Sequence, residues 1–244
     1  MRDAIRTGVS RLHRLIRPIP SERRFDYDRR LLVNPYLAEQ EAGLGDLYAA
    51  IERTGLSLGY PAWNLLYYTL LCSLPGTDPV VVETGTNHGF STIVLAQALI
   101  DAGAGGVVRT VDIDPGVVAV ARGHAERAGV AERIRFHVGD SYEFLDRLPD
   151  EVSHVDFAFL DGDHRAEHVI GEFERLYPLV AACDGKVYFD NTGRGGVAKA
   201  LRHIHKVHGG NLVEFPSCSW APPGNAIWQP KRPKRPAPAA RRRR

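Results

Sequence analysis

The stretch that decides the fold covers residues 79–92 and reads PVVVETGTNHGFST. A short β-branched run, a glycine-rich turn and a helical pattern follow one another here, which predicts a strand, a turn and a helix. Gly85 and Gly89 let the backbone pass close to a ligand, and the first helical turn presents unpaired N–H groups. Doubly wound sheets hold adenosine-type cofactors at such turns. The spacing Gly-x-x-x-Gly after Glu83 differs from the Gly-x-Gly-x-x-Gly of a dinucleotide pyrophosphate site.

Strand and helix patterns alternate after this stretch. Beyond the strand at 80–83, we expect strands at 107–112, 134–138, 155–160 and 186–189. We expect helices at 35–54, 61–74, 91–102, 117–128, 141–148, 166–176 (with Pro178 as a stop) and 197–208. Two closing strands at 212–215 and 226–228 have no helix between them, which predicts an antiparallel hairpin. The alternation predicts parallel βαβ units, and therefore an α/β, Rossmann-like doubly wound sheet with helices on both faces.

Composition divides the chain into three expected parts: an N-terminal helical cap at 1–75, the sheet domain at 76–229 and a disordered basic tail at 230–244. The two ends are basic and the body between them is acidic, although the formal net charge is only +2. An acidic body argues against nucleic acid as a partner. The basic ends allow weak contact with a membrane or another anionic surface. The amphipathic pattern of residues 1–20 fits a surface-seeking helix or a transit-like segment, and equally a helix packed on the domain itself or on a second subunit, which would be a homo-oligomer.

The cysteines indicate a reducing compartment. The chain has three, at positions 72, 183 and 218, without Cys-x-x-Cys spacing, which argues against a disulfide framework or a zinc site. No apolar run approaches the roughly 18 residues of a membrane span. We therefore expect a cytoplasmic protein.

Acidic residues stand at the ends of the first three strands. Asp112 comes 23 residues after Gly89, where a carboxylate can accept hydrogen bonds from ribose hydroxyls. Asp140 can accept from the exocyclic amine of adenine, and Ser141 can cap the next helix. Glu83 can hold the glycine turn or receive a ligand's amino group. Each could singly be a helix cap or a loop acid, but together they favour a cofactor site.

These residues resemble the motifs of class I S-adenosylmethionine-dependent methyltransferases over residues 79–229, with Glu83-x-Gly85-x-x-x-Gly89 as the core. The resemblance implies a mostly parallel sheet of order 3-2-1-4-5-7-6 with one antiparallel strand. It also implies that the methionine moiety lies over the glycines, with Ser91 near its carboxylate, and that Asp112 and Asp140 take the ribose and the adenine edge. The implied cofactor residues are Glu83, Gly85, Thr86, Gly89, Ser91, Asp112, Asp140 and Ser141.

A second polar set follows the fourth and fifth strands. Because neighbouring strands lie about 4.8 Å apart, their carboxyl ends converge beside the cofactor. Asp161, Asp190 and Asn191 then supply three oxygen ligands, a set that suits Mg²⁺. A divalent ion there would lower the pKa of a bound hydroxyl and orient it. His164, three residues after Asp161, can reach the same place as a general base.

This second set is similar to that of metal-dependent O-methyltransferases such as catechol O-methyltransferase, in which an Asp and an Asp-Asn pair hold Mg²⁺ and a Lys occupies the position of His164. The DGDH of residues 161–164 and the LYP of residues 176–178 look more like macrolide-sugar O-methyltransferases and the cephalosporin-hydroxylase-like branch. In the sugar enzymes a His serves as base, but the second metal position is usually Glu-Asp or Asp-Asp. Asp190-Asn191 departs from that pattern, so the acceptor class stays open.

The resemblance implies an S-adenosylmethionine-dependent O-methyltransferase acting on a hydroxyl of a phenolic, sugar or natural-product small molecule. The alternatives are a metal-independent small-molecule or nucleic-acid methyltransferase and a cephalosporin-hydroxylase-like protein. Base-amino methyltransferases usually show Asp/Asn-Pro-Pro-aromatic after strand 4, where this chain has LDGD at 160–163. Acceptor specificity is expected in the loop 192–196 and near Tyr60, Trp63 and Asn64, where Tyr60 and Trp63 either stack on a substrate or pack in the core.

Overall fold

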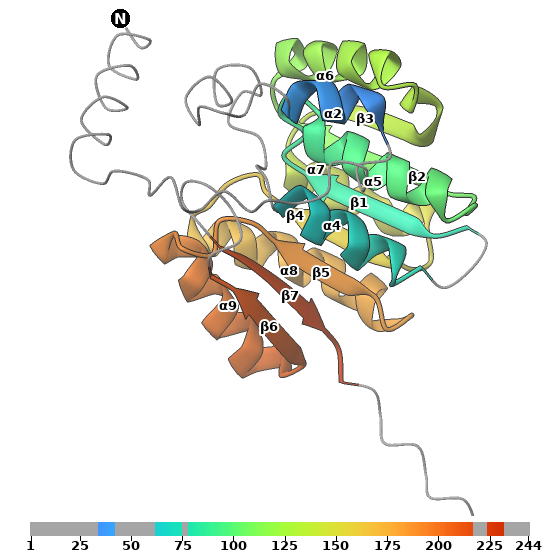
Figure 1. Cartoon of the computed structure of the whole chain (residues 1–244). Coiled ribbons are helices and arrows are strands. Elements are labelled where there is room, and N and C mark those ends of the chain that lie inside the picture. Colours follow the sequence, from blue (N-terminus) through green and yellow to red (C-terminus); the bar gives the residue numbers. More distant parts are fainter. Residues whose placement is uncertain (1–33, 42–61, 75–77, 217–223, 232–244) are drawn as a thin grey trace, which may run out of the picture. The chain divides into compact units, whose positions relative to one another are not determined.

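A seven-stranded, mostly parallel sheet forms the centre of the computed structural model of this chain, which describes residues 34–41, 62–74, 78–216 and 224–231 (Figure 1). Its strands are β1 (Val80–Thr84), β2 (Val107–Asp112), β3 (Ile134–Val138), β4 (Phe157–Leu160), β5 (Lys186–Phe189), β6 (Asn211–Phe215) and β7 (Asn225–Gln229). The spatial order is β3-β2-β1-β4-β5-β7-β6. β1 to β5 pair in parallel, whereas β7 is antiparallel to both β5 and β6. The expected order and closing hairpin are confirmed.

Helices cover both faces of this sheet (Figure 1). One face packs against α4 (Ala62–Leu71), α5 (Phe90–Asp101) and α6 (Pro115–Arg127), with a 3₁₀ turn, η3 (Ala131–Arg133), before β3. The other face packs against α7 (Ser141–Glu151), α8 (Ala166–Ala181) and α9 (Gly195–His208). A short helix, α2 (Pro35–Glu41), precedes them in the chain. The Rossmann-like fold class is therefore confirmed.

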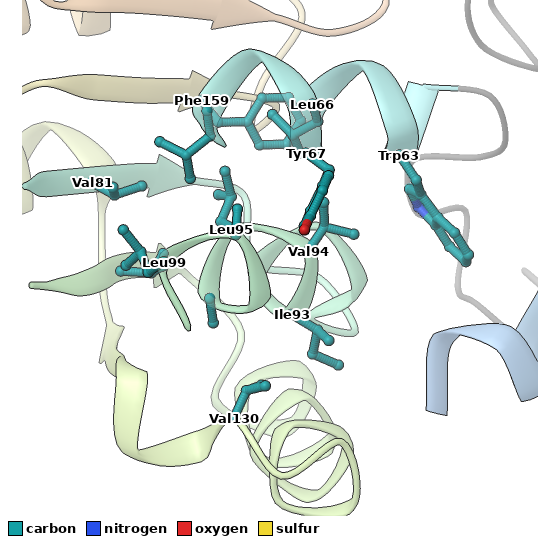
Figure 2. Packing of buried hydrophobic residues seen from close by; sticks show 14 of the residues in the cluster. Trp63, Leu66, Tyr67, Val81, Ile93, Val94, Leu95, Leu99, Val130 and Phe159 are labelled. Atoms are coloured by element: carbon teal, nitrogen blue, oxygen red, sulfur yellow. The ribbon is translucent and has the colours of Figure 1, made fainter. Parts of the chain in front are cut away.

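The central strands are apolar on both sides, so successive residues enter different cores. Val81 belongs to the core under α5 and its neighbour Val82 to the core under α8, and both are fully buried. Figure 2 shows the first core, in which Val81 and Phe159 of the sheet meet side chains of α4 and α5. Strands that are buried on both faces have near-continuous apolar sequences, as these do. In β1 the polar residues Glu83 and Thr84 come at the carboxyl end of the strand.

The aromatic residues Tyr60 and Trp63 were each expected either to stack on a substrate or to pack in the core, and the structure decides this for Trp63. Its ring is 1% exposed and stacks on Phe90 with ring centroids 5.9 Å apart. Trp63 therefore packs in the core instead of facing a substrate. Tyr60 lies outside the described residues, as do the residues from 42 on in the expected helix 35–54.

Two expected helix ends are wrong. Pro178 was expected to stop the helix before it, but α8 runs through Pro178 to Ala181. Proline lacks the amide proton that a helix interior uses. Leu179 and Val180 just beyond it are 8% and 0% exposed, and their burial against the sheet outweighs that loss. Similarly α7 passes through Pro149 to Glu151, where the sequence predicts an end at residue 148.

The expected helix at residues 1–20 and most of the basic tail lie outside the described residues, so both stay predictions, as does the division into cap, domain and tail. Within the described ranges, no helix combines the length and apolar character needed to cross a membrane.

Candidate functional site

The glycine turn between β1 and α5 has the backbone conformation that its sequence predicts. Gly85 and Gly89 have φ of 86° and 81°, in the region that favours glycine, and Asn87 between them has φ of 46°. No side chain caps α5 at Gly89, so the first-turn N–H groups are free of a side-chain partner. Free N–H groups at a helix N-terminus suit a carboxylate or phosphate group of a ligand.

Glu83 holds the helix start that follows this turn through two hydrogen bonds. Its side chain is fully buried, and its two carboxylate oxygens accept hydrogen bonds from the hydroxyls of Ser91 (2.6 Å) and Thr92 (2.5 Å). Burial raises the pKa of Glu83 to about 7, although these hydrogen bonds oppose the shift. The carboxylate therefore holds the start of α5, which is the first of its two expected uses. Ser91 retains its backbone N–H for a ligand.

Thr86 turns its side chain away from the loop. Its hydroxyl lies 2.6 Å from that of Thr110 on β2, and the residue is 1% exposed. Any contact of Thr86 with a cofactor would therefore involve its backbone.

Asp112 and Asp140 lie at the expected strand ends, and both also serve the local backbone. Asp112 accepts hydrogen bonds from the backbone N–H groups of Asn87 (2.8 Å) and Asp114 (3.1 Å). Asp140 caps α7 by accepting from the N–H of Tyr142 at 2.8 Å. The cap that the sequence assigns to Ser141 is thus wrong, because the extended backbone at Asp140 aims its carboxylate at the helix start. Each carboxylate keeps lone pairs for a further donor.

Sequence reasoning missed two exposed apolar side chains at this edge. Ile113 follows Asp112 and is 71% exposed, and Val138 at the end of β3 is 54% exposed. They flank the two acids at the carboxyl end of paired strands, since Asp112 aligns with Val138 in the β2–β3 register. Such side chains suit the faces of a planar ring. Their signal in the sequence is a large apolar residue within two positions of a strand-end acid.

The polar residues expected after β4 and β5 lie close together in the structure. Leu160 aligns with Phe189 in the register of β4 and β5, so Asp161 and Asp190 follow side by side. The Nε2 of His164 lies 3.3 Å from Oδ1 of Asp161. Asn191 has φ of 55° and donates from Nδ2 to Oδ2 of Asp190 at 2.8 Å.

Electrostatics at these tips favour a cation. Burial, with repulsion from Glu83 next, raises the pKa of Asp161 to about 8. Burial, with repulsion from Asp161 next, raises the pKa of Asp190 well above its usual range. Two adjacent carboxylates disfavour each other's charged form, and a positive ion between them relieves this.

The donor set contains two carboxylates and one amide oxygen. Among the described residues, no group of three or more His, Cys, Asp or Glu side chains is placed to hold a metal ion. The expected set, Asp161, Asp190 and Asn191, has only two members of those types. Oxygen donors in this number fit Mg²⁺, which keeps several waters when it binds to proteins.

His164 is suited to accept a proton. Burial, together with the charge of Arg194, lowers its pKa from 6.5. The imidazole is therefore neutral at pH 7 and has one nitrogen free to take a proton. Asp163 is not part of this arrangement, because its carboxylate pairs with Arg165 at 2.6 Å.

The structure adds Asn225, which no local pattern indicates. It begins β7 and is fully buried. Its Nδ2 donates to Oδ1 of Asp190. Its own Oδ1 is buried and has no hydrogen-bond partner among the described residues. Since Asn191 donates to the other oxygen, amides hold both oxygens of Asp190.

The family comparison agrees with the geometry. Residues 82–192 match a family model described as a methyltransferase domain. This stretch runs from β1 to just beyond Asn191, and so includes both polar sets.

Curated relatives of similar sequence are also methyltransferases. The chain is 42% identical over 129 residues to a catechol O-methyltransferase of Mycobacterium tuberculosis, which covers 52% of this chain and 54% of that protein. It is 33% identical over 118 residues to a caffeoyl-CoA O-methyltransferase of Stellaria longipes, covering 47% and 46%. The chain thus spans about half the length of the curated relatives it matches.

Solved structures share the fold. An O-methyltransferase of Bacillus cereus in complex with SAH superposes with a TM-score of 0.60 at 19% identity, covering 86% of this chain and 94% of that one. The O-methyltransferase TomG of Streptomyces achromogenes, in complex with SAM, superposes with a TM-score of 0.63 at 17% identity, covering 87% and 100%.

Proposed function

We propose that the chain, whose residues 82–192 match a family model described as a methyltransferase domain, transfers a methyl group from S-adenosylmethionine to a hydroxyl of a small molecule. The observation that carries this proposal is the contact between the two polar sets. A Cβ on Gly85 would lie 2.5 Å from the carbonyl oxygen of Asp161, so the cofactor turn adjoins the tip of β4. A methyl donor over the turn would then face an acceptor at the tips of β4 and β5.

Each part of the cofactor has a matching feature in this arrangement. The free N–H groups at the start of α5 suit the methionine carboxylate. Asp112 suits the ribose hydroxyls, while Ile113 and Val138 suit the faces of the adenine ring. The names of the solved neighbours support this choice of cofactor, since one was solved with SAH and another with SAM.

The chain's own groups supply the proton chemistry. The acceptor oxygen attacks the methyl carbon, the bond from that carbon to the sulfonium sulfur breaks, and S-adenosylhomocysteine leaves. His164 takes the proton from the hydroxyl, and Asp161, 3.3 Å away, stabilises the imidazolium that results. Asp161, Asp190 and Asn191 would hold Mg²⁺, which would lower the pKa of the hydroxyl.

A phenolic or sugar hydroxyl is the acceptor class that we propose. Its support is the set of relatives named after such substrates: besides catechol O-methyltransferase, a rhamnosyl O-methyltransferase of Mycobacterium bovis is 31% identical over 144 residues. A homo-oligomer, a cytoplasmic location and contact of the basic ends with anionic surfaces stay predictions.

The test is a transfer assay with methyl-labelled S-adenosylmethionine and a panel of catechols and deoxysugars, with Mg²⁺ or with a chelator. We expect labelled product only with Mg²⁺, and loss of product in Asp161→Ala. Asp163→Ala is the matched control, because this neighbouring carboxylate pairs with Arg165 instead. Product formation unchanged by the chelator and by Asp161→Ala would overturn the metal-assisted mechanism. The methyltransferase proposal itself fails if the protein does not bind S-adenosylhomocysteine in calorimetry.

A further inference from the structure

His168 on α8 lies between two parts of the candidate cofactor site. Its Nε2 is 3.1 Å from the hydroxyl oxygen of Ser141 at the start of α7, and 3.2 Å from Oε1 of Glu172. A carboxylate can only accept, so Nε2 carries a proton, which it shares between Oε1 of Glu172 and the hydroxyl oxygen of Ser141. The hydrogen bond to Glu172 raises the pKa of His168.

Glu172 continues this connection to the glycine turn. It is 1% exposed, and its Oε2 accepts a hydrogen bond from the hydroxyl of Thr84 at 3.1 Å. Thr84 is the last residue of β1 and directly precedes Gly85. A buried carboxylate is costly unless its oxygens are paired. Thr84 and His168 supply that pairing, so Glu172 fixes both of them.

The ring of His168 is also held from its face. Tyr142 stacks on it with ring centroids 4.6 Å apart and planes 16° apart, and the guanidinium of Arg175 lies 4.0 Å from the centre of the Tyr142 ring. Gly171 makes room for this stack, because a Cβ there would collide with the Tyr142 hydroxyl. The imidazole is therefore fixed in orientation as well as by its hydrogen bonds.

We propose that His168 is a positioning residue for cofactor binding, which ties Ser141 beside the adenine site to Glu172, Thr84 and the glycine turn. This inference rests on the proposed function, because it assumes that S-adenosylmethionine binds between these elements. In this proposal His168 acts through Ser141, Glu172 and Thr84 and not by a contact of its own with the cofactor. It sets the spacing between α7 and β1, so its loss loosens the cofactor site without removing a direct contact.

The chain offers a matched control in a second histidine that pairs with a glutamate of α8. His208 on α9 pairs with Glu174 of α8 at 2.8 Å, so it is also a histidine–glutamate pair, and its ring packs against Phe173 and Tyr177, which are not residues of the candidate site. Losing either pair removes one hydrogen bond to a carboxylate. Only the loss of the His168 pair is expected to change cofactor affinity.

The test is calorimetric titration of the full chain with S-adenosylhomocysteine, alongside thermal unfolding. We expect His168→Leu to raise the dissociation constant about tenfold, because the loosened site must be ordered again when the cofactor binds. His168→Gln, whose side-chain amide can donate from a similar place, should restore the constant to within about threefold of the unchanged protein. His208→Leu should leave it within about twofold.

Thr84→Val keeps the test decisive if His168→Leu does not fold, because it removes only the hydroxyl that reaches Glu172. It should also weaken binding, by about threefold to tenfold. Equal affinity in His168→Leu (or in Thr84→Val) and the unchanged protein would overturn the inference, as would an equal loss in His208→Leu. An unchanged protein that does not bind S-adenosylhomocysteine would instead contradict the proposed function, and the inference with it.

Discussion

Gly85 and Asp161 are in backbone contact: a Cβ on Gly85 would lie 2.5 Å from the Asp161 carbonyl oxygen and 2.7 Å from its carbonyl carbon. The cofactor turn after β1 and the polar tip of β4 therefore form one surface. Their separation cannot change without moving a strand, because Asp161 N–H also donates to the Thr84 carbonyl at 3.0 Å. A methyl donor bound on the turn would thereby be held at a set distance from His164 and Asp190.

Gly85→Ala should abolish binding of S-adenosylhomocysteine and destabilise the fold by more than the roughly 1–3 kcal/mol of left-handed strain alone. The added methyl group would meet the Asp161 backbone, which cannot yield as a side chain can. Gly103→Ala is the control, since Gly103 also has positive φ but nothing lies within 4 Å of its Cβ position. Calorimetric titration and chemical unfolding measure both effects. Equal losses of stability in the two variants would show that the contact is not restrictive.

His164→Gln should lower kcat by about 10²- to 10⁴-fold, because it removes the general base and keeps a polar group of similar size. The matched control is His154→Gln, since His154 pairs with Asp156 at the same 3.3 Å before the start of β4. Initial rates with labelled cofactor measure the difference. A kcat that falls equally in the control would contradict the role of His164.

The pH dependence of kcat follows from the same residue. Burial lowers the pKa of His164 from 6.5, so the neutral, proton-accepting form persists below pH 6.5. With Mg²⁺ saturating at every pH, we expect the fall in rate that follows protonation of the imidazole to be centred below pH 6.5. A fall centred between about pH 7 and pH 8 under the same conditions would mean that another group is the base.

Thermal stability in a chelator should fall as pH rises. The pKa values of Glu83 and Asp161 are raised to about 7 and about 8 in the folded protein, and that of Asp190 is raised as well. Between roughly pH 4 and pH 8 these three groups thus bind more protons in the folded state than in the unfolded chain, so their contribution to the free energy of unfolding decreases with pH. This contribution is complete below about pH 4 and is lost as these groups ionise.

Scanning calorimetry from pH 5 to pH 8 checks this linkage. Asp161→Asn should flatten the decline in Tm, because an amide does not ionise. Added Mg²⁺ should raise Tm most at pH 8, where the ion meets charged carboxylates. A Tm profile that Asp161→Asn does not change, or an ion effect that is largest at pH 5, would contradict the prediction.

Asn225→Leu should lower Mg²⁺-supported activity by about 10- to 100-fold, the usual effect of losing a residue that orients a metal ligand. The substitution removes the amide that donates to Asp190 and leaves the volume of the side chain similar. Gln229→Leu is the control on the same strand, because its amide donates to the carbonyl of Asp184, away from the strand tips. Equal activity in Asn225→Leu and the unchanged protein would show that Asn191 alone orients Asp190.

Most of the fold could be predicted because its signals are local. Alternating β-branched runs and helical patterns mark each strand and helix, and the turn at 85–89 needs glycine at its positive φ angles. The errors fell where packing outweighed a local signal. Burial of Leu179 and Val180 carried α8 past Pro178, and the extended backbone at Asp140 took the cap from Ser141.

The candidate site divides in the same way. The sequence by itself determined the residues at the carboxyl ends of β1 to β5, Glu83, Asp112, Asp140, Asp161 and Asp190, because parallel strands must present their ends at one edge. Only the tertiary structure decided which group each carboxylate meets: Asn225 reaches Asp190 from β7, and His168 links Ser141 to Glu172. Those contacts join residues far apart in the chain, and no local spacing encodes the packing of a helix or an edge strand that brings them together.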